Sequence, residues 1–144
     1  MTSRRLLHLM VLAHHHPEHL DRCLLLPLGG RRLAICARCA ALYPTLALGL
    51  LLQRAAHLPA LGLADWLLTI SGILPALLDW GLNWTGRRRG TNAMRLATGA
   101  LLGLALARSI WLYLHDPRSE VFWVQGGLLV AGALAFELVR RLRL

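Results

Sequence analysis

Long apolar runs separated by short polar segments dominate this chain. Four of the runs reach about the 20 residues that a helix needs to cross the hydrocarbon core of a bilayer. They cover residues 33–52, 58–78, 96–114 and 121–139. A soluble domain of 144 residues has too small a core to surround four such helices. The pattern therefore predicts an all-α polytopic membrane protein with four transmembrane helices.

The segment before the first span follows a different pattern. Residues 24–28 and 31–35 are two short, mainly apolar arms on either side of Gly29-Gly30, which predicts a β-hairpin that returns Cys36 towards Cys23. Residues 1–38 thus form an N-terminal Cys/His segment leading into a four-helix domain at 33–144. We expect no cleaved signal peptide, because His8 interrupts the early apolar run and His14 follows it where small residues should stand.

Composition changes the picture through the position of its charges. The chain is 56% hydrophobic, has a formal net charge of +9, and carries arginine but no lysine. Such a charge would suit nucleic-acid binding if the arginines shared one amphipathic face. They flank the apolar runs instead, so we expect lipid phosphates as partners and no nucleic acid.

The arginines also predict an orientation. Thirteen of the sixteen lie before or at the start of the first run, between the second and third runs, or after the fourth. The positive-inside rule then places both termini and the loop around Arg87 in the cytoplasm, in a multi-pass protein of the inner (plasma) membrane.

Two further features concern packing inside the membrane. Asp65 and Arg108 should reach similar depths on antiparallel helices and form an ion pair; we interpret the pair as a structural clamp in preference to a charged relay, because no other polar residue accompanies it. Small residues recur every four positions, which favours close helix packing or a homo-oligomer. They are Gly99, Gly103 and Ala107 in the third run, and Gly127, Ala131 and Ala135 in the fourth.

Cysteine and histidine residues gather at the N-terminal end. Cys36 and Cys39 have the two-residue gap that lets two thiolates bind one ion, and His19 lies one helical turn before Cys23. The pattern predicts a zinc site formed by Cys23, Cys36, Cys39 and His19, with His16, His15 and His14 as alternative fourth ligands in that order. An iron-sulfur cluster or copper(I) fits this ligand set less well. Two alternatives remain open, a redox-active thiol pair and small apolar cysteines beside a solvated histidine run.

A second polar cluster is predicted at the cytoplasmic ends of the second and third runs. Asp79 and Asn83 share one helical face, and the loop that follows is rich in arginine, glycine and asparagine. Guanidinium groups bind phosphate in a bidentate manner, so an anionic lipid headgroup or a phosphorylated substrate is the expected ligand. The predicted ligand-binding residues are Asp79, Asn83, Arg87, Arg88, Arg89, Asn92 and Arg95. The alternative is a basic loop that only sets the topology, with Asn92 capping the third helix.

With these segments described, the chain resembles the bacterial and archaeal membrane proteins grouped as domain of unknown function 2085. The resemblance covers roughly residues 14–103 and rests on Arg22-Cys23, Cys36-Ala37-Arg38-Cys39 with Tyr43, and the series Asp79, Arg87 to Arg89, Asn92, Arg95, Thr98-Gly99. Ala40-Ala41, Pro44 and Trp80 depart from the family pattern. The arginine-rich cluster is also weakly similar to the cytoplasmic motif of VanZ-like membrane proteins. Neither resemblance implies a reaction.

These observations lead to three hypotheses for the function. The leading one is a binding or accessory protein with a zinc-stabilised N-terminal segment and a cytoplasmic site for an anionic lipid or phosphate-bearing ligand. The second is a metal-dependent hydrolase or transferase that acts on a lipid headgroup, with Asp79 as the candidate general base. The third is a membrane thiol redox protein that uses Cys36 and Cys39. A carrier is not expected, because no span is rich in polar residues.

Overall fold

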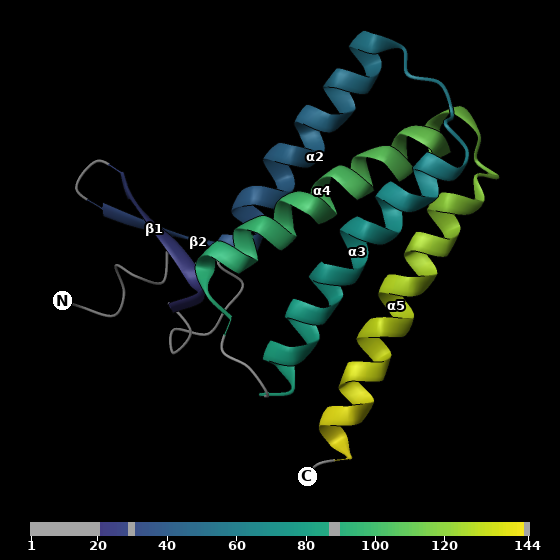
Figure 1. The fold of residues 1–144 in the computed structure, drawn as a ribbon. Helices are drawn as coiled ribbons and strands as arrows, with labels where there is room; N and C mark the ends of the chain where they lie inside the picture. The colour runs from purple at the N-terminus through teal and green to yellow at the C-terminus, as the bar shows by residue number, and fades with distance from the viewer. Residues whose placement is uncertain (1–20, 29–30, 87–89, 143–144) are drawn as a thin grey trace.

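The protein consists of a short β-hairpin followed by a bundle of long helices (Figure 1). The computed structural model describes residues 21–28, 31–86 and 90–142. The hairpin strands are β1 (Cys23–Leu28) and β2 (Arg31–Cys36). The helices are α2 (Ala37–Ala56), α3 (Leu63–Trp84), α4 (Asn92–His115) and α5 (Glu120–Arg141).

All four of these helices are long and apolar enough to cross a membrane, which confirms the all-α, four-span prediction. Several of their boundaries differ from the predicted ones by four to six residues, including the starts of the first two spans. The first span starts at Ala37 because residues 33–36 belong to β2, where backbone pairing with β1 satisfies their polar groups. The second starts at Leu63, because residues 58–62 form a connection in which Gly62 adopts a positive φ of 60°.

The helices alternate in direction, so each end of the bundle collects two helix starts and two helix ends (Figure 1). We call the end with the starts of α2 and α4 the Arg38 end, and the opposite end the Arg108 end. Within the described chain, α4 packs most extensively on α2 and then on α3, whereas α5 packs mainly on α3. The hairpin projects sideways from the Arg38 end (Figure 1).

The predicted hairpin is present, and its register brings Cys23 directly opposite Cys36. Both cysteines are buried, as are the neighbouring Ala34 and Ala37. The base of the hairpin is therefore part of the packed structure, while Leu25 and Leu26 further along β1 are exposed.

The small-residue pattern of α4 forms the contact with α2. A Cβ atom on Gly99 would collide with the backbone carbonyl of Arg38, and one on Gly103 would lie 2.5 Å from the carbonyl oxygen of Leu42. The α5 pattern behaves differently. Gly127 has no atom within 4 Å of a built Cβ, and Ala131 and Ala135 are exposed. That pattern makes no close helix contact within the described chain, and its use in a homo-oligomer stays a prediction.

At the Arg108 end, the predicted ion pair is formed between two buried side chains. Arg108 donates from Nε to Asp65 Oδ1 at 2.6 Å, from NH1 to Gln53 Oε1 at 3.0 Å, and from NH2 to the carbonyl oxygen of Pro59 at 2.5 Å. The second carboxylate oxygen of Asp65 accepts from the backbone N–H of Leu61 at 2.8 Å. The cluster ties α2, α3, α4 and the α2–α3 connection together.

The prediction that no other polar residue accompanies this pair was wrong. Gln53 joins it directly, and Ser109 donates to Gln125 of α5 beside it. Thr69 lies one helical turn from Asp65 and is also fully buried. The structural interpretation is nevertheless supported, because every guanidinium nitrogen of Arg108 has a protein acceptor.

Candidate functional site: a polar cluster at the Arg38 end

The candidate site lies where α2, α3 and α4 meet at the Arg38 end. Asp79 of α3 is buried and forms an ion pair with Arg38, which stands in the first turn of α2. Its Oδ1 accepts from Asn83 at 3.0 Å, and its Oδ2 accepts from Thr98 of α4 at 3.5 Å. Both carboxylate oxygens are thus occupied by groups from three helices.

Asn83 connects Asp79 to the start of α4. Its Oδ1 accepts from the backbone N–H of Gly90 at 2.7 Å and from Arg95 NH2 at 3.4 Å. A side chain at Gly90 would collide with Asn83 and Asp79, so this close approach of the loop requires glycine. The predicted shared face of Asp79 and Asn83 is therefore present.

Arg95 differs from the other members of the cluster in the way its charge is surrounded. It is only 6% exposed, and its hydrogen bonds go to two neutral acceptors, Asn92 Oδ1 at 3.0 Å and Asn83 Oδ1 at 3.4 Å. No carboxylate forms an ion pair with it among the described residues. A buried guanidinium without a counterion is costly, so an anion that bound beside Arg95 would stabilise its charge.

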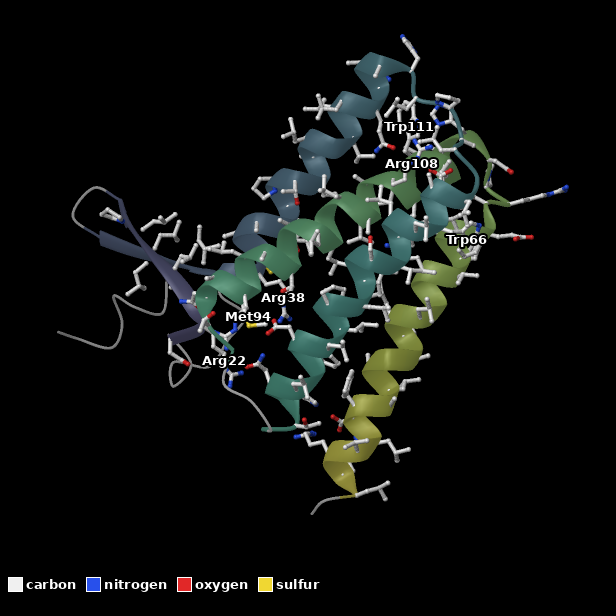
Figure 2. The ribbon with its side chains drawn as sticks, viewed as in Figure 1. Arg22, Arg38, Trp66, Met94, Arg108 and Trp111 are labelled. Carbon is white, nitrogen blue, oxygen red and sulfur yellow. The ribbon has the colours of Figure 1, made fainter. Side chains whose placement is uncertain are left out.

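Two further guanidinium groups have donors without an acceptor. The Nε atoms of Arg22 and Arg38 are buried and lack a hydrogen-bond partner among the residues that the structure describes. Figure 2 shows Arg22 and Arg38 at the end of the bundle where the hairpin joins, far from Arg108 and Trp111 at the opposite end. The end of the bundle where the hairpin joins therefore combines Arg22, Arg38 and Arg95 with the buried carboxylate of Asp79.

The thiol of Cys23 lies beside this cluster. Its pKa is raised, first by burial and then by the neighbouring Cys36 and Asp21, and only the positive charge of Arg95 opposes this. A redox-active cysteine needs a lowered pKa, so the environment of Cys23 does not favour thiol redox chemistry.

The predicted zinc ligands are brought together in part. Cys23 and Cys36 face each other across the hairpin, and Cys39 follows Cys36 by one turn of α2. Among the residues that the structure describes, no group of three or more His, Cys, Asp or Glu side chains is arranged to hold a metal ion. The predicted fourth ligands His14, His15, His16 and His19 lie outside the described residues.

Some of the other predicted site residues lie in the cluster, and the rest lie outside the described residues. Asp79, Asn83, Asn92 and Arg95 belong to the cluster, whereas Arg87, Arg88 and Arg89 lie outside the described residues. The expectation that Asn92 caps the third helix was wrong. The cap is Thr91, whose hydroxyl accepts from the backbone N–H of Met94 at 3.2 Å, and this leaves Asn92 free to bind Arg95.

Sequence reasoning missed the pairing of Arg38 with Asp79. In the sequence, Arg38 is noted only as part of the Cys36-Ala37-Arg38-Cys39 motif and as one of the arginines that flank the first apolar run. The available signal was the one used for Asp65 and Arg108, an isolated charge in one apolar run that needs an opposite charge in another. The position of Arg22 at this end of the bundle had no such signal, because it depends on how the hairpin folds back (Figure 2).

The chain matches the family described as "Predicted membrane protein (DUF2085)" over residues 14–108, and it belongs to that family. The match includes the hairpin, α2, α3 and α4 as far as Arg108, and therefore both polar clusters except for the contribution of α5. No curated protein and no solved structure matches the chain. The protein is thus a membrane protein of a family whose description states no activity.

Proposed function

We propose that this protein binds a phosphate-bearing anion, a lipid headgroup or a phosphorylated small molecule, at the polar cluster of the Arg38 end. The observation that carries the proposal is the buried Arg95, which has neutral hydrogen-bond partners and no described counterion. Arg22 and Arg38 add buried Nε–H donors without acceptors. Guanidinium groups match phosphate oxygens in geometry as well as charge.

In this proposal Asp79 is a positioning residue. It holds Arg38 and, through Asn83, orients Arg95. The enzyme alternative needs Asp79 as a general base, but its two oxygens already accept from Arg38, Asn83 and Thr98. A binding or accessory function therefore fits the contacts better than metal-assisted hydrolysis or transfer.

The proposal includes an orientation with the Arg38 end in the cytoplasm. The positive-inside distribution of the arginines supports this orientation. A reporter enzyme that works only in the periplasm should then be active when it is fused at Arg54, at the other end of α2.

We expect Arg95→Gln to weaken the binding of inorganic phosphate by roughly ten- to hundredfold, which corresponds to one charge-assisted hydrogen bond. Glutamine keeps hydrogen-bonding capacity but removes the positive charge. Titration calorimetry of the purified protein in detergent measures the affinity.

Arg54→Gln is the matched control for that experiment, because it removes the same charge from an exposed position at the Arg108 end of α2. Its affinity for phosphate should equal that of the wild type. Equal affinities of the wild type and Arg95→Gln, or a wild type without saturable binding, would contradict the proposal.

A zinc ion bound by Cys23, Cys36, Cys39 and His19 remains a second proposal. What supports it is the hairpin register that places Cys23 beside Cys36, next to the start of α2. Zinc bound by four protein ligands would act structurally and fix the hairpin against the bundle.

We expect about one zinc ion per chain in wild-type protein purified without a His-tag or a chelator, and a loss of both zinc and thermal stability in Cys39→Ser. Elemental analysis and unfolding in detergent measure the two effects. His19→Ala should lose less zinc, because a neighbouring histidine can replace it. Full zinc occupancy in Cys39→Ser, or none in the wild type, would disprove this proposal.

A further inference from the structure

A groove with a volume of about 200 Å³ runs along the bundle beside the polar cluster. Its lining includes Ala76 and Trp80 of α3, Leu102 of α4, and Leu129 and Ala133 of α5; Arg38 supplies the charged group. Apart from that guanidinium the lining is apolar. The groove therefore joins a hydrophobic surface within the spans to Arg38 of the candidate site.

The packing of α5 explains why the groove exists. At the Arg38 end, α5 is held against α3 by Trp84 Nε1, which donates to Glu137 at 3.1 Å, and by Phe136, whose ring meets Trp80 edge to face and covers Gly81. At this end α4 runs away from α5 and towards α2 (Figure 1). The glycines of α4 pack closely against α2 and hold the two helices together. The groove lies between α4 and α5, and α3 forms its floor. The small side chains of Ala76 and Ala133 leave this space unfilled.

We infer that one hydrocarbon chain of an anionic, phosphate-bearing lipid occupies this groove while its headgroup binds the arginines of the Arg38 end. The inference rests on the proposed phosphate site and names the class of its ligand. The volume lies below the range of about 300–1,000 Å³ of pockets that enclose compact ligands, but it suits a segment of an extended chain.

Charge and surroundings both support a lipid as the occupant. The groove lies among helices that are long and apolar enough to span a membrane, where lipid chains are the surrounding solvent. Arg38 lines the groove and also binds Asp79, and its buried Nε–H has no acceptor within the described part of the chain. A headgroup phosphate at that position would meet the guanidinium while its chain continues along α3.

The test compares Ala133→Phe, which fills the groove, with Ala131→Phe, which places the same ring on an exposed position of α5 two residues away. Native mass spectrometry in detergent measures the binding of long-chain phosphatidic acid and of phosphatidylcholine with the same chains. Titration calorimetry measures the binding of inorganic phosphate. Ala133→Leu is a smaller filling variant in case the phenylalanine disturbs folding.

We expect Ala133→Phe to weaken binding of phosphatidic acid by roughly tenfold, equivalent to losing the burial of about two methylene groups. Its affinity for inorganic phosphate should not change, Ala131→Phe should bind as the wild type does, and phosphatidylcholine should bind more weakly than phosphatidic acid. This set of results would support both the groove and the phosphate site.

Other outcomes separate the two proposals. Unchanged binding of phosphatidic acid by Ala133→Phe and Ala133→Leu, with phosphate still bound, would overturn the groove and leave the phosphate site standing. Equal binding of phosphatidylcholine and phosphatidic acid would overturn the inference that the lipid must carry an anionic headgroup. A wild type without saturable binding of inorganic phosphate would overturn the proposed function itself.

Discussion

Arg108→Leu is expected to lower the free energy of unfolding by about 3–5 kcal/mol, the usual cost of removing one partner from a buried ion pair. Asp65 is 3% exposed and would be left as a buried carboxylate without its guanidinium. Gln53 and the carbonyl of Pro59 would lose a donor as well. Unfolding in detergent, followed by the fluorescence of the tryptophans, measures the loss.

The double variant Asp65→Leu with Arg108→Leu should recover much of this loss, because no buried charge then remains. The recovery should be incomplete, since Gln53 and Pro59 still lack the donor. Arg54→Leu is the control, because Arg54 is exposed near the end of α2, where a measurable effect is not expected. Strictly additive losses in the double variant would show that the two charges do not interact.

The second large effect is expected from Gly103→Ala, which should destabilise the protein by about 1–3 kcal/mol through overpacking. The added Cβ would lie 2.5 Å from the carbonyl oxygen of Leu42 and would also collide with the hydroxyl of Thr45. The Thr45 side chain can rotate, but the backbone of α2 cannot move without separating the helices. Alanine is otherwise the better helix former, so a loss of stability isolates the steric effect.

Gly126→Ala is the matched control on α5, because no atom lies within 4 Å of its built Cβ. It should be neutral or stabilising by up to about 1 kcal/mol. Equal stabilisation by Gly103→Ala and Gly126→Ala in the same unfolding measurement would mean that α2 and α4 do not approach as closely as described.

The polar cluster at the Arg38 end could be predicted only in part. Asp79 and Asn83 are four residues apart on one helix, so their proximity follows from helical geometry alone. Arg38 and Thr98 reach the same carboxylate from two other helices, at separations of 41 and 19 residues. No local rule connects positions so far apart, and the arginine could equally have reached the interface by itself.

The buried ion pair at the Arg108 end was easier to predict. Asp65 and Arg108 lie on adjacent antiparallel spans, and counting residues from the span ends places them at the same depth. Depth does not determine which other residues join them. Gln53 stands near the end of its helix and Gln125 near the start of another, and only the packing directs both side chains inward.

The sequence by itself determined the class of protein, the number of spans, the β-hairpin and the positions of the charged groups. These properties depend on the length of apolar runs and on contacts between near neighbours, and both are encoded locally. Only the tertiary structure decided that Arg95 is buried without a counterion among the described residues, and that a groove lies between α4 and α5. It also decided that the α4 glycines pack against α2, while Gly127, Ala131 and Ala135 of α5 make no close helix contact within the described chain. These properties depend on the angles at which helices cross. The small differences in packing energy that set those angles involve every side chain at the contact and leave no periodic pattern in the chain.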